Sequence, residues 1–173
     1  MDELGHQVEA PGGEAYDGIV KEFGPEFVNQ DGTLNRRKLG AEVFEKPERL
    51  KKLNALVHPA VRAKAAALET AFLAHRPDGI AVTEAAILIE SGSFKDFDCL
   101  ILVVCGQEQQ VQRAMARDGL SREEVLRRLE RQMPLEEKMK YANYIIDTSG
   151  AKEHTREQTR IVYERLRSLT QKA

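Results

Sequence analysis

Tryptophan is absent from the 173 residues, and cysteines, aromatic residues and long apolar stretches are scarce. The only two cysteines, Cys99 and Cys105, lie in or beside an apolar run, so we expect reduced thiols and no disulfide. No stretch approaches the roughly 20 apolar residues of a membrane helix, and the N-terminus lacks the basic-then-apolar pattern of a signal peptide. A cytoplasmic protein that does not bind a membrane is therefore expected.

An excess of positive charge is also lacking. The 26 Lys and Arg residues are set against 28 Asp and Glu, which gives a formal net charge of -2. This balance excludes a broadly basic nucleic-acid-binding protein, although a local basic patch can still bind a phosphorylated small molecule. With 42% hydrophobic and 31% charged residues, the chain can bury one core. We expect a single domain, as a monomer or weak oligomer, without a nucleic-acid partner.

The first seventy or so residues show helical periodicity. Apolar residues share one face over residues 14–23, and Gly24 ends that segment as a C-terminal cap does. A second helix is predicted over residues 34–44. A third begins at Pro47, and Pro59 marks a boundary or kink before an alanine-rich run that continues as a helix. This part of the chain is therefore predicted to be almost entirely helical.

Short continuous apolar runs begin after Asp78. Residues 79–92 and 97–106 are bounded by glycine and charged residues, a pattern typical of strands covered on both faces of a parallel sheet. Residues 143–147 form a weaker third candidate. Strands that alternate with helices predict an α/β layered fold with a helical insertion near its start.

Three helices are predicted among these strands. They cover residues 108–119, residues 121–133, where Ser121 and Glu124 are spaced as a capping box, and Glu153 to Gln171.

Arginines are concentrated on two of these helices. Arg113 and Arg117 are four residues apart and share one helical face. Arg127, Arg128 and Arg131 lie on the next helix. Guanidinium groups bind phosphate oxygens in bidentate fashion, so the cluster is a candidate phosphate site. Spacing alone favours the alternative of a solvated charged face, which neighbouring glutamates partly neutralise.

Other candidate residues have structural alternatives. Glu84 and Glu90 bracket an apolar run, and a carboxylate at the carboxyl end of a parallel strand can hold a magnesium ion through water. Glu90 can equally cap a helix or pair with an arginine. His58 is by default a helix-end histidine bonded to backbone, and Tyr16 a core residue. Residue patterns alone do not name a reaction.

Six blocks of the sequence carry a resemblance to a known family. In order and spacing, the chain resembles dephospho-coenzyme A kinase over essentially its whole length, in the blocks "DELGHQVEAPGGEAYDGIVKEFG", "DGTLNRRKLGAEVF", "LNALVHPAV", "EAAILIESG", "QVQRAMARDGLSREEVLRRLERQM" and "ANYIIDTSG".

That resemblance implies a fold and a reaction. The fold would be P-loop NTPase-like, similar to nucleoside monophosphate kinases, with three layers around a parallel sheet. Residues 14–75 would form a helical substrate-binding insertion, residues 76–112 and 133–173 the core, and residues 113–132 the lid over ATP. The reaction would be ATP-dependent phosphorylation of the ribose 3′-hydroxyl of dephospho-CoA, the last step of coenzyme A synthesis, with Mg²⁺ present.

The resemblance also implies residue roles. Asp2 matches the family's general base on the ribose hydroxyl, and Arg113 matches the lid arginine that stabilises the transferring phosphoryl group, with Arg117 in support. Thr148 replaces an asparagine near the adenine and, with Arg113 and Arg117, would bind the nucleotide. The other implied roles are dephospho-CoA contacts from Tyr16, Arg36 and His58, and orientation of Mg²⁺ through water by Glu84.

The phosphate-binding motif of such kinases, G-x-x-x-x-G-K-[ST], does not occur in the 173 residues. In the family, the block that resembles "DELGHQ" follows a strand, this loop, a helix and a second strand. We therefore expect that the start codon was assigned late, that the first strand and loop are missing, and that the chain as written does not turn over ATP. Exposed sheet edges and poor solubility would follow.

Two alternatives remain open. One is a short product that binds dephospho-CoA without catalysis, and the other is a different small-molecule kinase of the same fold.

Overall fold

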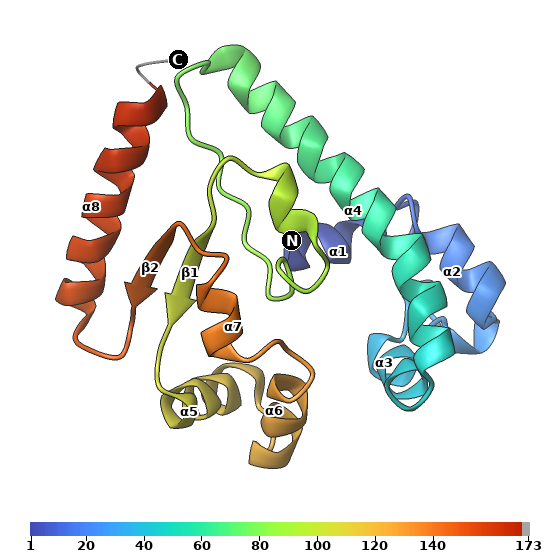
Figure 1. Cartoon of the computed structure of the whole chain (residues 1–173). Helices are drawn as coiled ribbons and strands as arrows, with labels where there is room; N and C mark the ends of the chain where they lie inside the picture. The colour runs from blue at the N-terminus through green and yellow to red at the C-terminus, as the bar shows by residue number, and fades with distance from the viewer. Residues whose placement is uncertain (171–173) are drawn as a thin grey trace. The chain divides into compact units, whose positions relative to one another are not determined.

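The computed structural model describes residues 1–170, apart from the side chains of Asp2 and Glu45, and it divides into two compact units. Unit 1 is Met1–Ala85 and unit 2 is Ala86–Ala173 (Figure 1). The elements of unit 1 are α1 (Asp2–Val8), α2 (Tyr16–Phe23), the 3-10 helix η1 (Pro25–Phe27), α3 (Arg36–Glu45) and α4 (Pro47–His75). Those of unit 2 are η2 (Ser93–Asp96), β1 (Ile101–Val104), α5 (Gln107–Asp118), α6 (Arg122–Leu129), α7 (Leu135–Met139), β2 (Tyr144–Asp147) and α8 (Lys152–Thr170).

Unit 1 is a helical unit built around α4, against which α1, α2 and α3 pack. Ile19 of α2 is completely buried, and Phe23 meets Phe27 edge to face, with ring centroids 6.2 Å apart. The helices predicted over residues 14–23 and 34–44 are confirmed as α2 and α3. Helix α1 was not predicted, because seven residues are too few to show a clear helical period.

Helix α4 begins at Pro47, as predicted, and continues for 29 residues with Pro59 inside it. Of the two alternatives predicted at Pro59, the boundary is therefore wrong, and the kink stays a prediction. Proline removes one backbone hydrogen bond, but Val57 before it and Ala60 and Val61 after it all pack into the same core. Burial on both sides of Pro59 keeps the helix continuous.

The sheet of unit 2 contains β1 and β2, paired in parallel with Val103 opposite Ile146. This confirms the strands predicted within residues 97–106 and 143–147 and the parallel α/β character. Helix α7 packs on β1 and α8 on β2. The prediction that both faces are covered is wrong for the described residues, because Val103 is 60% exposed and Ile145 is 40% exposed.

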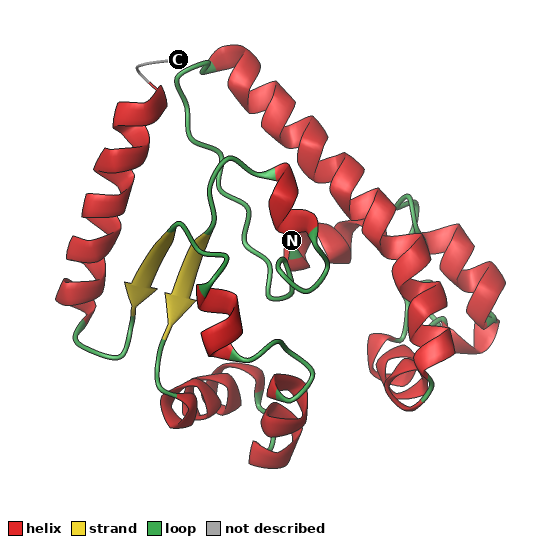
Figure 2. Ribbon diagram, in the orientation of Figure 1, coloured by secondary structure: helices red, strands yellow, loops and turns green. Residues whose placement is uncertain are grey.

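Residues 79–92 do not form the predicted strand. They are drawn as loop in Figure 2: the segment before Ala86 is irregular, and a series of turns follows it. An apolar run becomes a strand only when a neighbouring strand accepts its backbone hydrogen bonds, and the described residues contain no third strand. Val82 in this segment is consequently 78% exposed.

Helices α5 and α8 lie where helices were predicted, whereas α6 ends at Leu129, before the predicted end at residue 133. Ser121 and Glu124 form both hydrogen bonds of a capping box at the start of α6, as predicted. Gly119 ends α5 with φ +66°, a conformation that favours glycine. Helix α8 matches the predicted last helix, although Gln171 lies outside the described residues. Over residues 1–170, no helix combines the length and apolarity required to cross a membrane.

Candidate functional site

Arg113 and Thr148, which are 35 residues apart in the sequence, are brought together at the carboxyl ends of the parallel strands. The guanidinium Nη1 of Arg113 donates to Thr148 Oγ1 at 3.0 Å, and Nη2 donates to the Thr148 carbonyl at 2.8 Å. Thr148 directly follows β2, and Arg113 lies in the middle of α5. Ligands of open parallel sheets bind at this edge. Two residues that the sequence assigned to nucleotide binding therefore share one location.

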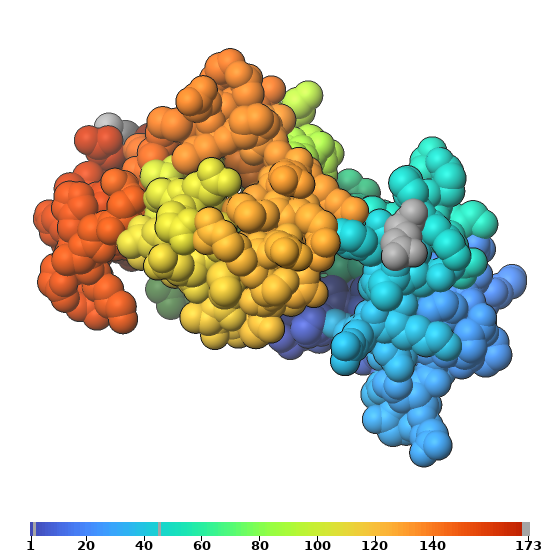
Figure 3. Space-filling model, turned by 90° about the horizontal axis from the view of Figure 1, so that it is seen from below, coloured from blue at the N-terminus to red at the C-terminus, as the bar shows by residue number. Residues whose placement is uncertain are grey.

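Of the other arginines of the predicted cluster, Arg117 lies on α5, Arg127 and Arg128 lie on α6, and Arg131 lies in the turn after α6. Helices α5 and α6 pack on each other, and their surfaces are continuous in the yellow and amber region of Figure 3. Arg117 forms an ion pair with Asp118, with Nε 2.7 Å from Oδ1. The hydrogen bonds from Arg117 hold the pKa of Asp118 below its usual value. Arg122 binds Glu108 in bidentate fashion at 2.8 and 2.7 Å. Such exposed ion pairs are consistent with the alternative that this arginine-rich surface is a solvated charged face. Arg113 differs, because no carboxylate among the described residues forms an ion pair with it.

Arg36 and Tyr16, predicted to contact the substrate, make separate structural contacts in unit 1. Arg36 Nη2 donates to the His6 carbonyl at 3.1 Å and forms an ion pair with Glu9 at 3.0 Å. Burial raises the pKa of Glu9 although Arg36 and His6 act to lower it. The Tyr16 hydroxyl donates to the Gly32 carbonyl and so ties the turn before α3 to α2. Arg36 thus joins the start of α3 to α1.

His58 is a half-buried residue of α4, one position before Pro59. Burial lowers its pKa, and the charge of Arg62 adds to this effect. The imidazole is therefore neutral near pH 7, which suits a hydrogen-bonding role better than a role as a cation. No hydrogen bond or ion pair among the described residues connects His58 with Tyr16 or Arg36.

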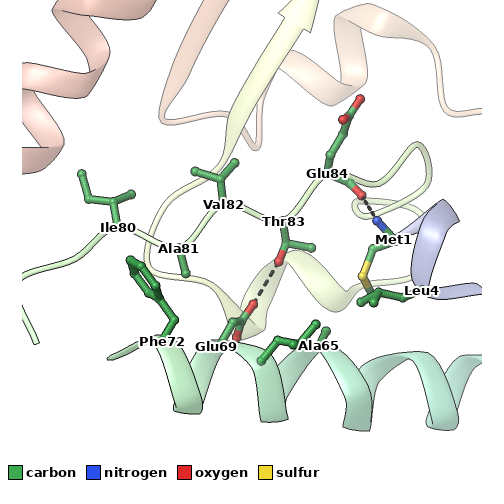
Figure 4. Close-up of a pocket in the computed structure, with 11 residues that line it drawn as sticks. Met1, Leu4, Ala65, Glu69, Phe72, Ile80, Ala81, Val82, Thr83 and Glu84 are labelled. Atoms are coloured by element: carbon green, nitrogen blue, oxygen red, sulfur yellow. Dashed lines mark hydrogen bonds between the residues drawn. The ribbon is translucent and has the colours of Figure 1, made fainter. Parts of the chain in front are cut away.

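Glu84 ends the segment 80–84, and its side chain points away from α4 (Figure 4). Its carbonyl accepts a hydrogen bond from the Met1 nitrogen at 2.7 Å, while Thr83 Oγ1 donates to Glu69 at 2.9 Å. Asp2 lies in α1, but its side chain is outside the described residues, so its predicted role as general base stays a prediction.

A pocket of about 280 Å³ lies between segment 80–84, α1 and the second half of α4 (Figure 4). Its lining is largely apolar and includes the acidic residues Glu69 and Glu84 but no lysine or arginine. A lining with two acidic side chains and no basic side chain does not suit phosphate groups.

The side chains described form no group of three or more histidine, cysteine, aspartate or glutamate residues that could hold a metal ion. Glu84 therefore belongs to no such group, although Glu69 lines the same pocket. A magnesium ion is usually bound by one or two carboxylates together with waters and substrate phosphates, so a single acid fits a water-mediated role but not a metal cage built by the protein.

Sequence reasoning missed one polar cluster in unit 2. Lys138, which is 9% exposed, forms an ion pair with Glu90 Oε1 at 2.9 Å and donates to Gln132 Oε1 at 2.9 Å. The Met133 amide donates to the same Glu90 oxygen at 2.9 Å. Burial opposes ionisation of Glu90, but these hydrogen bonds outweigh it and lower its pKa. The alternative that Glu90 pairs with an arginine is wrong, because its partner is Lys138.

Comparisons with known proteins agree with one another. A family model described as dephospho-CoA kinase matches residues 1–154. A dephospho-CoA kinase of Syntrophus aciditrophicus is 37% identical over 166 residues, which is 96% of this chain and 71% of that protein. One of Aquifex aeolicus is 39% identical over 165 residues, 95% of this chain and 82% of that protein. A crystal structure of a Thermus thermophilus protein superposes with a TM-score of 0.73 at 36% identity, covering 95% of this chain and 82% of that one.

Proposed function

Because this chain belongs to the dephospho-CoA kinase family, we propose that it acts in the transfer of the terminal phosphoryl group of ATP to the ribose 3′-hydroxyl of dephospho-CoA. Both substrates are phosphorylated small molecules, in keeping with a chain of net charge -2 whose arginines are locally concentrated. A P-loop NTPase-like fold, with residues 14–75 as substrate-binding insertion and residues 113–132 as lid, is part of the proposal.

One observation supports the nucleotide side most strongly: Arg113 is held at the carboxyl end of the sheet by neutral oxygen atoms of Thr148. Neutral acceptors leave the positive charge of the guanidinium uncompensated, so the charge is available to phosphate oxygens. As charge develops on the transferring phosphoryl group, a cation fixed in advance stabilises the transition state without reorganisation. Arg117 is proposed to assist from the same helix.

The proposed chemical step is an in-line displacement. The 3′-oxygen of the ribose attacks the γ-phosphorus of ATP, the bond to the β-γ bridging oxygen breaks, and ADP leaves. The proton of the 3′-hydroxyl passes to the carboxylate of Asp2. Magnesium would supply charge neutralisation there, and Glu84 is proposed to orient it through water. A Glu84→Gln variant with unchanged dependence of nucleotide affinity on Mg²⁺ would remove Glu84 from this role.

The proposed substrate side lies in unit 1, where Tyr16, Arg36 and His58 are assigned to dephospho-CoA. Among the described side chains, the carboxylate that pairs with Arg36 is that of Glu9, and the Arg36 side chain is 39% exposed, so further guanidinium donors can reach a phosphate of the substrate. His58, neutral near pH 7, is proposed to offer a hydrogen bond to a polar group.

Isothermal titration calorimetry of this chain with dephospho-CoA tests the substrate assignment. We expect binding that Arg36→Met weakens by about tenfold, because a charge-assisted hydrogen bond contributes about 1.5–3 kcal/mol. Arg37→Met, which removes the exposed neighbouring guanidinium, is the matched control. Absence of dephospho-CoA binding, or equal loss in both variants, would contradict the assignment.

A parallel assay of ADP formation distinguishes the proposed kinase activity from the two alternative functions. The motif that cradles phosphates is not among the 173 residues, so we expect no turnover of ATP by this polypeptide alone. Dephospho-CoA binding that is indifferent to ATP would favour a non-catalytic binding role, and preference for another phosphate acceptor would favour a different kinase of the same fold.

A further inference from the structure

The turn that follows β2 is fixed by hydrogen bonds from two helices. Gln158 of α8 accepts from the Asp147 amide at 2.9 Å and donates to the Asp147 carbonyl at 2.8 Å. Gln109 of α5 donates to the Ser149 carbonyl at 3.1 Å, and the Ser149 amide donates to Asp147 Oδ1 at 2.8 Å. Thr148, between these anchored residues, therefore has little freedom to move.

The hydroxyl of Thr148 has no further proton to donate. A threonine hydroxyl carries a single proton, and that of Thr148 is donated to the Val104 carbonyl at 3.0 Å. Its oxygen then accepts from Arg113 Nη1, and its backbone carbonyl accepts from Arg113 Nη2. A nucleotide that required a donor from this hydroxyl would have to break the bond to Val104.

We infer that Thr148 is a positioning residue, which aims the Arg113 guanidinium at a polyphosphate chain and does not itself contact the nucleotide. This inference rests on the proposed function and deepens it. We call the chain of hydrogen bonds from Val104 through Thr148 to Arg113 the relay. Val104 and the anchored turn fix the two oxygen atoms of Thr148, and these oxygen atoms fix two N–H groups of Arg113. Other N–H groups of the guanidinium remain for phosphate oxygens.

The relay is tested first without any ligand. In this chain, NMR detection of the Arg113 guanidinium should show slow rotation about the Nε–Cζ bond. Thr148→Val should speed this rotation by about tenfold, since one hydrogen bond to a charged group is lost, and Thr148→Ser should restore the slow rate. The valine variant should stay folded, because the backbone amide of residue 148 still donates to Val104. Equal rotation rates in all forms would overturn the inference.

Binding of inorganic tripolyphosphate, measured by calorimetry, is the second test. Thr148→Val should weaken binding about tenfold in the native chain but have no effect when Arg113 is already replaced by methionine. Additive losses in this double-mutant cycle would mean that Thr148 contacts the phosphates directly, and the inference would fail. Thr159→Val is the matched control, because it removes a hydroxyl bonded to a helix carbonyl at 2.8 Å.

The two tests also separate the inference from the function on which it rests. Suppose that the Arg113 guanidinium rotates slowly only when residue 148 carries a hydroxyl, while wild type and Arg113→Met bind tripolyphosphate equally. That result would confirm the hydrogen-bond relay but refute the nucleotide-binding role of Arg113. The inference that Thr148 positions Arg113 for the reaction would then be refuted as well.

Discussion

Removing the charge of Lys138 should destabilise unit 2 far more than removing the charge of Lys140, two residues later. Both lysines pair with a glutamate, Lys138 with Glu90 at 2.9 Å and Lys140 with Glu137 at 2.6 Å. Burial distinguishes them: the side chains of the first pair are 11% and 20% exposed, whereas those of the second are 66% and 51% exposed. The shorter pair is thus the more solvated one.

The expected magnitudes follow from burial. Breaking a buried pair by removing one partner costs about 3–5 kcal/mol, because the remaining charge is left uncompensated in a medium of low dielectric constant. Since the Glu90–Lys138 pair retains some exposure, we expect Lys138→Met to lower the free energy of unfolding by about 2–4 kcal/mol. Lys140→Met should lower it by less than about 1 kcal/mol, as for surface pairs in general.

The assay is equilibrium unfolding in urea, followed by circular dichroism, on both variants and on Glu90→Gln. In the double variant Glu90→Gln with Lys138→Met neither charge remains, so its loss should be smaller than the sum of the single losses. Equal destabilisation by Lys138→Met and Lys140→Met, or strict additivity in the double variant, would refute the argument from burial.

The same pair predicts a pH dependence. The pKa of Glu90 is lower in the folded protein than its usual 4.5, so the unfolded chain takes up the proton first as the pH falls. The stability from this pair is present above pH 4.5 and is lost as the pH falls through the lowered pKa. The difference between wild type and Lys138→Met should therefore shrink below pH 4.5.

Further predictions concern a histidine, an exposed apolar residue and a helix cap. The pKa of His58 is below its usual 6.5, so the unfolded chain binds more protons and stability falls as the pH drops below 6.5; His58→Gln should reduce this slope in pH-dependent melting curves. Val82→Lys should raise the concentration at which light scattering detects association, because Val82 is an apolar side chain that is 78% exposed. Ser121→Ala should cost about 1 kcal/mol in urea unfolding through loss of the α6 capping box.

Each of these has a control on the same chain. For the histidine, the wild-type slope is the reference, and Thr70→Lys on the exposed part of α4 should alter association less than Val82→Lys does. Ser168→Ala removes a hydroxyl within α8 and should cost less than Ser121→Ala. An equal effect of a control and its partner would count against the corresponding mechanism.

Local signals predicted the parts of the fold that depend on near neighbours. The capping box at Ser121 and Glu124 requires residues only three positions apart, and it formed as expected. Packing between distant residues decided two features that local signals did not predict. The core around Val61 keeps α4 continuous, so no helix boundary lies at Pro59. The apolar run over residues 79–92 has no neighbouring strand among the described residues, so it does not form a strand.

The candidate site shows the same division. Residue patterns identified Arg113 and Thr148 separately, through the arginine cluster and the family resemblance, but gave no indication that they bind each other. The buried Glu90–Lys138 pair joins residues 48 positions apart and has no local signature, so no pattern identified Lys138.

The amino-acid sequence by itself determined the helical first half, the parallel α/β second half, the family and the residue types able to bind phosphate. These depend on periodicity, short-range caps and ordered blocks that can be seen along the chain. Only the tertiary structure decided which arginine is held by neutral acceptors, which lysine is buried and which apolar run lacks a partner. Hydrogen bonds and burial between distant residues depend on how the chain folds back on itself, and a linear pattern does not contain that information.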